Sequence, residues 1–253
     1  SLMVSAGLAG AGGVSVLGLA LTMPVFFLAR IVEGVAAGAS APAGAWLAFD
    51  TSGAAGSVAV GRIGERGGAG PDVEVLARVL IEDRFEQASR LVPSIDQALR
   101  MAGVERSRLA GIVVGEGPGS FTGVRVAAAT AKGLVHALGL PLRAVSSLAA
   151  CALAHDGTGV RYVLFDARGD RVYGACYGVG RAELQELVPP HAGTLRDVLA
   201  GDVPPGALFV GDGAERHKAA IEAAGLTVDA DAPSRTLAEG LLEHLALCDG
   251  AAA

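Results

Sequence analysis

The chain has 253 residues, of which 51% are hydrophobic and 18% charged, and it carries a net charge of −6 at pH 7. Intrinsic disorder is excluded, because it requires low hydrophobicity together with high net charge. The acidic balance also argues against a protein that binds nucleic acid on its own, since affinity for phosphates depends on clustered Lys and Arg. The length is enough for one large domain or two smaller ones.

The first 45 residues form an unusually apolar extension. No charged residue occurs from Leu2 to Ala29, a run longer than a membrane-spanning helix needs. Five glycines and Pro24 weaken the helical pattern within this run. Three interpretations stay open: an extension from a fusion or a gene boundary, a membrane anchor, and a helical addition packed on the domain.

From Trp46 onward, short apolar strands alternate with amphipathic stretches, which is typical of an α/β fold. A strand over 46–50 ends in Asp50, and a tight turn leads into a second strand over 57–60. The same pattern recurs over 162–166, where the strand ends in Asp166, and the chain returns over 172–177.

A second pair of similar segments, 113–117 and 209–213, follows in the same order, so we expect an internal duplication. The first half is assigned to residues 46–150 and a reduced second half to 151–253. Two related α/β halves that each open with an Asp-bearing hairpin describe the fold of actin, sugar kinases and heat-shock ATPases.

Two helices are predicted in the first half. The stretch 86–102 has one apolar stripe, and Gly103 is a suitable stop. The stretch 121–138 is rich in Ala and Val, and its charges, Arg125 and Lys132, are too few to cover one face. We therefore expect this second helix to be buried on several sides, in its own core or against a partner.

The segment GEGPGSFTGVR, residues 115–125, follows an apolar strand and opens the second helix. Its glycines permit a close backbone approach, and Ser120 can cap the helix through its hydroxyl group. Free amides at a helix start can also bind phosphate. The segment lacks the Gly-Lys-Ser/Thr of a Walker loop and the glycine spacing of a dinucleotide site. On the residues alone, ligand binding and a tightly packed turn explain this loop equally well.

Cysteine and histidine placement predicts no metal site. Cys151, Cys176 and Cys248 match neither a disulfide framework nor a zinc pattern, and we expect them to be reduced and mostly buried. None of the five histidines lies one helical turn from another, as helical metal pairs require.

The glycine segment and the opening strand 47–52 closely resemble the hallmark motifs of the TsaB family, formerly YeaZ. The similarity continues through Pro141 and the segments 145–148, 166–168 and 172–173, and it covers residues 46–225. It implies a duplicated actin-like ATPase fold and the role of a dimerisation subunit in the bacterial machinery for tRNA threonylcarbamoyladenosine. The implied partners are TsaD, which carries the metal and transfers the threonylcarbamoyl group, the ATPase TsaE, and a second copy of the chain.

The resemblance also implies a non-catalytic protein. TsaD-type proteins hold iron or zinc with a His-x-x-x-His pair at the position where this chain has EQASRL, residues 86–91. We expect no catalytic residue, no metal and no cofactor of its own. Any nucleotide binding is expected only in the complex, and tRNA is contacted only through it. A cytoplasmic location follows, with membrane association of residues 1–45 left open.

Three sets of site residues follow from these considerations. The glycine loop contributes Gly115, Gly117, Gly119, Ser120, Thr122, Gly123 and Arg125. The resemblance places a partner interface on the two helices, with Leu91, Ile95, Leu99, Ala127, Ala131 and Leu134 as its apolar centre. Asp50 and Asp166 are either remnants of a magnesium–nucleotide site or caps of their own hairpin turns, and we favour the caps. The alternative function is a small-molecule kinase or ATPase that uses these two aspartates and the glycine loop.

Overall fold

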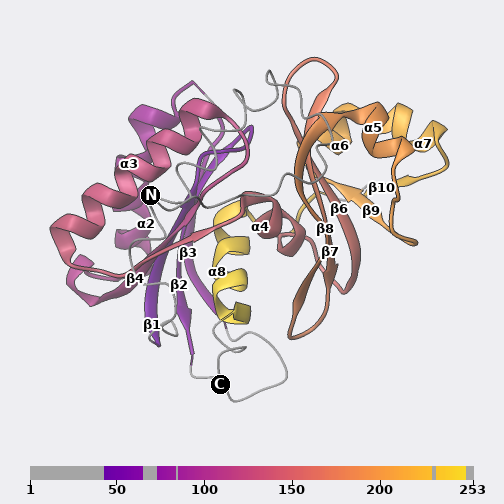
Figure 1. Ribbon diagram of the computed structural model, residues 1–253. Helices are drawn as coiled ribbons and strands as arrows, with labels where there is room; N and C mark the ends of the chain where they lie inside the picture. The colour runs from indigo at the N-terminus through magenta and orange to yellow at the C-terminus, as the bar shows by residue number, and fades with distance from the viewer. Residues whose placement is uncertain (1–42, 65–72, 84, 230–231, 249–253) are drawn as a thin grey trace, which may run out of the picture.

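The computed structural model describes residues 43–64, 73–83, 85–229 and 232–248 (Figure 1). The apolar extension up to residue 42 lies outside the described residues, and so do the three interpretations of it. Among the described residues, no helix is long and apolar enough to cross a membrane.

The first half is built on a five-stranded sheet with the strand order β3-β2-β1-β4-β5. Its strands are β1 (Gly44–Asp50), β2 (Gly56–Ile63), β3 (Val73–Ile81), β4 (Leu109–Gly115) and β5 (Leu142–Val145). Strands β1, β2 and β3 pair antiparallel, whereas β1, β4 and β5 pair in parallel. The helical elements of this half are α2 (Gln87–Ala102), the short 3₁₀ turn η1 (Arg106–Arg108), α3 (Phe121–Leu138) and α4 (Ser147–Leu153). The two predicted helices are confirmed as α2 and α3, and Gly103 ends α2 with a φ of 64°.

The second half repeats this arrangement in a five-stranded sheet with the order β10-β9-β6-β7-β8. Its strands are β6 (Gly159–Asp166), β7 (Arg171–Val179), β8 (Leu184–Thr194), β9 (Leu208–Val210) and β10 (Thr227–Val228). The sequence of antiparallel and parallel pairs is the same, so β6 corresponds to β1 and β9 corresponds to β4. This correspondence confirms the predicted duplication.

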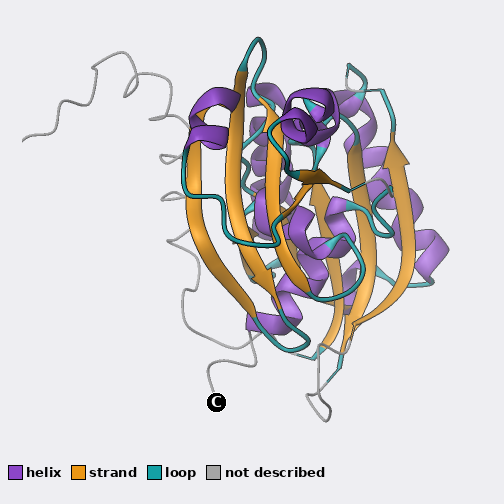
Figure 2. Ribbon diagram, turned by 90° about the vertical axis from the view of Figure 1, so that its right-hand side faces the viewer, coloured by secondary structure: helices purple, strands orange, loops and turns teal. Residues whose placement is uncertain are grey.

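The second half is also the reduced one, as expected. Its helices α5 (Leu195–Ala200), α6 (Asp212–Arg216) and α7 (Lys218–Ala223) have five or six residues each, whereas α2 and α3 have 16 and 18. Figure 2 views the molecule from this side, with short helices lying over the strands of the second sheet.

Helices cover both faces of each sheet, and Figure 1 shows the layers in succession. Helices α2 and α3 lie outside the first sheet, α4 and α8 (Leu237–Cys248) lie between the sheets, and α5 to α7 lie outside the second. Side chains alternate along β1 because successive residues of a strand point to opposite faces. Leu47 and Phe49 pack under α2 and α3, while Trp46 and Ala48 pack against α8. Asp50, two residues beyond Ala48, therefore faces the middle layer.

The last helix, α8, returns from the second half to the first. The Ala238 amide donates to the buried Ser57 Oγ at 3.0 Å. Gly240 permits a close approach to α4, because a Cβ atom there would lie 2.1 Å from the Ala150 carbonyl oxygen. The helix begins with a reciprocal cap between Thr236 and Glu239, with hydrogen bonds of 2.8 and 3.3 Å. A segment from the end of the chain thus completes the core of the first half.

Candidate functional site

Asp50 ends β1 and is fully buried. Its Oδ1 accepts hydrogen bonds from the amide and the hydroxyl group of Ser52, both at 2.6 Å. Its Oδ2 accepts from Ser147 Oγ, at the start of α4, at 2.5 Å. The same Ser147 oxygen accepts from the Gly117 amide at 3.1 Å. Asp50 therefore caps its own turn, the role favoured from the sequence, and it also ties β1 to α4 and the glycine loop.

Asp166 occupies the equivalent place at the end of β6. Its Oδ1 accepts from the Arg168 amide at 2.9 Å, and its Oδ2 pairs with the Arg216 guanidinium at 2.5 Å. Its own amide donates to Asp212 Oδ1 at 3.0 Å. Arg168 has a φ of 70°, which is uncommon for a residue with a side chain. The second aspartate thus also caps its turn, and an arginine balances its charge.

The glycine loop packs against the β1–β2 turn so closely that side chains do not fit. A Cβ atom at Gly115 would lie 1.7 Å from Asp50 Oδ2, and one at Gly119 would lie 2.4 Å from the Ser52 carbonyl oxygen. The Ser120 amide donates to that same Ser52 oxygen at 2.7 Å. The glycines at these two positions are therefore required by contacts within the chain itself.

The start of α3 lies equally close to the same turn. A Cβ atom at Gly123 would lie 1.7 Å from the Thr51 carbonyl oxygen, and Thr51 Oγ1 donates to the Gly123 carbonyl at 2.7 Å. The buried Gln87 amide bridges the Thr51 carbonyl and the Gly56 amide, each at 3.0 Å in the orientation that pairs donor with acceptor. Helix α2 is thereby joined to the hairpin as well, a contact that the sequence did not suggest.

Of the remaining loop residues, Ser120 and Gly117 have the roles expected from the sequence, whereas Thr122 and Arg125 lie on the surface. Ser120 Oγ accepts from the Gly123 amide at 3.3 Å, so the predicted helix cap is confirmed. Gly117 has a φ of 91°, the positive value for which glycine is suited. Thr122 and Arg125 are exposed, and the Arg125 guanidinium lies 5.0 Å from the centre of the Phe121 ring. The close packing accounts for the glycines without any ligand.

The residues chosen for the centre of a partner interface lie instead in the core of the first half. Five of the six are buried and the sixth packs against them: Leu91, Ile95, Leu99, Ala127 and Ala131, with Leu134 at the margin. This corrects the choice of residues, because a side chain inside the core is not available to a partner. An apolar stripe at helical spacing marks the face that a helix buries, and here the chain's own sheet covers it. Whether α2 and α3 bind a partner stays a prediction.

Three other apolar side chains are exposed close to where α2 and α3 begin. They are Phe85 (88% exposed), Val92 (57%) and Phe121 (56%). The two helix starts meet at Gln87 and Gly123, because a Cβ atom on Gly123 would lie 3.4 Å from the Gln87 side chain. The sequence pattern counted Val92 in the apolar stripe of the first helix, whereas the structure exposes it. Phe85 and Phe121 were not predicted as surface residues, since each precedes or opens a helix and belongs to no stripe.

A cleft of about 510 Å³ lies between the two halves. Ala54 and Leu80 line it from the first half, Phe165 and Asp212 line it from the second, and Cys151 of α4 lies between them. Neither Asp50 nor Asp166 belongs to the described residues that line this cleft. Their placement therefore does not support the less favoured alternative, in which the two aspartates face one nucleotide from either side.

Burial raises the pKa of two groups that line the cleft, Cys151 and Asp212. Burial raises the pKa of the Cys151 thiol, and the nearby carboxylates of Asp212 and Asp50 raise it further. Burial also raises the pKa of Asp212 itself. The thiol therefore stays protonated at neutral pH and is a poor nucleophile. The prediction of buried, free cysteines is confirmed for Cys151 and Cys176, whereas the side chain of Cys248 lies outside the description.

The described residues contain no group of three or more His, Cys, Asp or Glu side chains arranged to hold a metal ion. The absence of a metal and of a cofactor stays a prediction, as does the absence of a catalytic residue.

Comparisons with known proteins agree on one family. The family model described as "TsaD: tRNA N6-adenosine threonylcarbamoyltransferase" matches residues 84–250, which is more than half of the chain. The tRNA threonylcarbamoyladenosine biosynthesis protein TsaB of Bacillus subtilis is 34% identical over 155 residues, covering 58% of this chain and 66% of the relative. TsaB of Haemophilus influenzae is 37% identical over 131 residues, covering 50% and 51%. The alignments thus span less than two thirds of these relatives' own length.

Solved structures give the same result. YeaZ from Pseudomonas aeruginosa superposes with a TM-score of 0.63 at 29% identity, over 82% of this chain and 92% of that one. A second structure, described as an uncharacterized protein with similarity to peptidase YEAZ from Pseudomonas aeruginosa, gives a TM-score of 0.64 at 29% identity with the same coverage.

The fold and the matched region together define the class: the chain belongs to the TsaD family of actin-like α/β proteins. Within it, the identities with TsaB and the superposition on YeaZ make the chain a member of the TsaB (YeaZ) group.

Proposed function

We propose that this chain is a non-catalytic scaffold subunit in tRNA threonylcarbamoyladenosine biosynthesis. It binds TsaD, together with TsaE, and so supports threonylcarbamoyl transfer to N6 of the tRNA adenosine 3′ of the anticodon. It works in the cytoplasm, pairs with a second copy when TsaD is absent, and contacts tRNA only through the complex. The names of its TsaB relatives support the pathway.

The observation that carries the non-catalytic role is the state of Asp50 and the glycine loop. A phosphotransferase needs carboxylate oxygens that face a metal ion and loop amides that face a phosphate. Here both Asp50 oxygens accept hydrogen bonds from Ser52 and Ser147. The loop backbone lies against the β1–β2 turn, and Ser120 donates its amide to Ser52. The groups that an ATPase would use satisfy one another instead.

The exposed apolar side chains near the starts of α2 and α3 support a partner surface. Phe85, Val92 and Phe121 are large apolar side chains that are more than half exposed, and side chains of this kind are candidates for contact with a partner. Aromatic residues are enriched in the buried centres of such interfaces. We assign TsaD to this surface, with Val92 and Phe121 in place of the buried stripe.

Reconstitution tests the role directly. Unmodified tRNA is incubated with TsaD, TsaE and the threonylcarbamoyl-adenylate synthase, with and without this chain, and the modified nucleoside is measured. We expect modification only when the chain is present. Equal modification without it would contradict the scaffold role.

A matched pair of variants tests the surface. We expect Val92→Asp to weaken TsaD binding at least roughly ten-fold, because it places a charge among apolar contacts. Gln97→Asp is the control, because it introduces an aspartate at another exposed position of α2. This variant should bind TsaD as tightly as the unchanged protein does. Equal binding of TsaD by both variants would contradict the assignment of this surface.

Magnesium-dependent ATP turnover by the isolated chain would instead favour the kinase or ATPase alternative.

A further inference from the structure

The chain crosses between its two halves twice, and both crossings meet at the end of α4. The first crossing runs from Ala154 to Thr158, between α4 and β6. The second leads from Asp229, just after β10, to Leu237 at the start of α8. Halves of a molecule swing relative to each other only if a few residues at such crossings are free to change φ and ψ.

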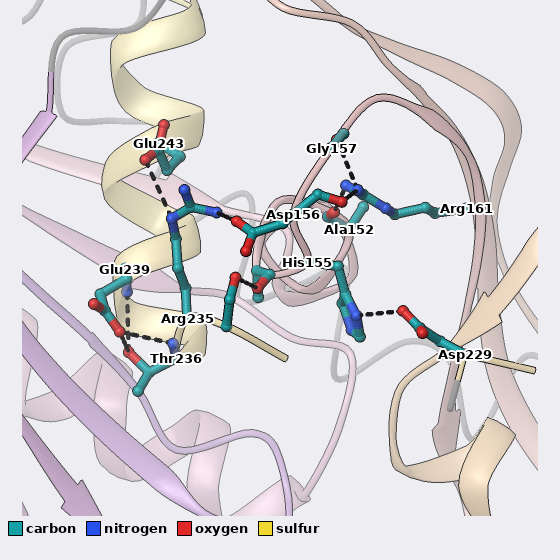
Figure 3. Close-up of polar contacts among 12 residues, drawn as sticks. Ala152, His155, Asp156, Gly157, Arg161, Asp229, Arg235, Thr236, Glu239 and Glu243 are labelled. Carbon is teal, nitrogen blue, oxygen red and sulfur yellow. Dashed lines mark hydrogen bonds and ion pairs between the residues drawn. The ribbon is translucent and has the colours of Figure 1, made fainter. Parts of the chain in front are cut away.

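Residues of the second crossing form hydrogen bonds and an ion pair with residues of the first crossing. The Arg235 amide and Ser234 Oγ both donate to the Ala154 carbonyl, at 3.0 and 3.2 Å. The Arg235 guanidinium pairs with Asp156 at 3.0 Å and with Glu243 of α8 at 3.6 Å. Figure 3 shows Arg235 reaching from the start of α8 to both carboxylates.

A second contact lies on the other side of the same helix end. His155 Nδ1 is hydrogen bonded to Asp229 Oδ2 at 2.9 Å (Figure 3). The His155 side chain is only 7% exposed and that of Asp229 is 18% exposed, so water has little access to this bond. We call these five residues the hinge clamp: His155, Asp156, Asp229, Ser234 and Arg235.

Arg161 of β6 fixes the carbonyl groups of the first crossing. Its guanidinium donates to the carbonyls of Ala152, Asp156 and Gly157 at 2.5, 2.5 and 2.7 Å. Arg161 is only 4% exposed, so a rotation at this crossing would leave a charged group buried without its partners. The close contact of Gly240 with Ala150 also fixes α8 against α4, the helix from which the first crossing departs.

We propose that the hinge clamp holds the two halves in a single relative orientation, so that the cleft between them neither opens nor closes. A rotation about the two crossings breaks several hydrogen bonds at once. The Arg235–Asp156 pair is exposed to water, but the bonds from His155 to Asp229 and from Arg161 to the Ala152 carbonyl are shielded, and water cannot readily replace them. The proposal is independent of the proposed function, because it concerns how the isolated chain moves and not what it binds.

Distance measurement between the halves tests the proposal. Spin labels are attached at Ser107→Cys in the first half and Glu222→Cys in the second, both exposed positions. Cys248 is changed to Ser in every sample, and an excess of unlabelled protein suppresses distances between copies. We expect one narrow distance distribution for the unchanged clamp. We expect Ser234→Ala combined with Arg235→Gln to widen it at least roughly two-fold.

Arg62→Gln is the matched control. It also removes one arginine from an ion pair, with Glu74 at 2.6 Å, but this pair joins strands β2 and β3 and involves no residue of either crossing. It should leave the distribution unchanged. A wide or two-peaked distribution in the unchanged protein overturns the proposal, and so does an unaltered width in the double variant. The distribution in the unchanged protein tests the proposal even if the double variant does not fold. The fluorescence emission of the buried Trp46 shows whether the double variant is folded.

Discussion

Replacing Gly123 by Ala tests the close packing at the start of α3. A Cβ atom at this position would lie 1.7 Å from the Thr51 carbonyl oxygen, and real Cβ contacts are essentially never shorter than 3.0 Å. The β1–β2 turn and α3 must therefore separate by more than about 1 Å. Gly123 has a helical backbone without positive φ, so the contact alone is responsible for the strain.

The expected cost combines three contributions. Overpacking costs about 1–3 kcal/mol. The loss of the hydrogen bond from Thr51 Oγ1 to the Gly123 carbonyl costs about 1 kcal/mol more. The better helix propensity of Ala returns about 1 kcal/mol. We therefore expect the free energy of unfolding to fall by about 2 kcal/mol and the melting temperature to fall by roughly 4–8 °C.

The same helix provides the control. Gly133 is exposed, and a Cβ atom there would have nothing within 4 Å, so Gly133→Ala gains helix propensity without a clash. We expect it to raise the melting temperature by roughly 2–4 °C. Thermal unfolding of both variants, followed by circular dichroism, is the measurement. If Gly123→Ala melts at or above the temperature of the unchanged protein, the packing explanation of the glycine loop is refuted.

Three further predictions concern buried polar groups. Arg161→Met should lower the free energy of unfolding, measured by urea denaturation, by about 3 kcal/mol, because three carbonyl groups lose their donor. A decrease below about 1 kcal/mol would show that these hydrogen bonds contribute little to stability. Asp50→Asn should cost about 1–3 kcal/mol, since one of the two accepting oxygens becomes an NH2 group that faces the donors of Ser52 or of Ser147. An equally stable variant would contradict this arrangement. Burial lowers the pKa of His244 from 6.5 to about 4. Between these pH values the unfolded chain binds more protons than the folded chain. The free energy of unfolding should therefore be highest above pH 6.5 and fall by up to about 3 kcal/mol as the pH is lowered towards 4. In His244→Gln this part of the pH dependence should disappear, and an unaltered pH profile would assign it to other groups.

The sequence by itself determined the local structure and its repetition. The two Asp-bearing hairpins, the two long helices of the first half and the cap at Ser120 all follow from short patterns, namely strand runs, a helical stripe and a serine before a helix. The repeated order of these patterns determined the duplicated fold. Each signal acts between residues that are near in the chain, so each can be recognised without the tertiary structure.

Only the tertiary structure decided which surface covers each element. A stripe such as Leu91 and Ile95 shows that a helix buries one face, but the sheet beneath it and a partner protein would produce the same stripe. Asp50 meets Ser147 across 97 positions, and Asp229 meets His155 across 74. Such pairs arise from how the strands and helices are stacked, and the sequence carries no local sign of them. For that reason the close packing of the glycine loop and the contacts of the hinge clamp became visible only in the folded chain.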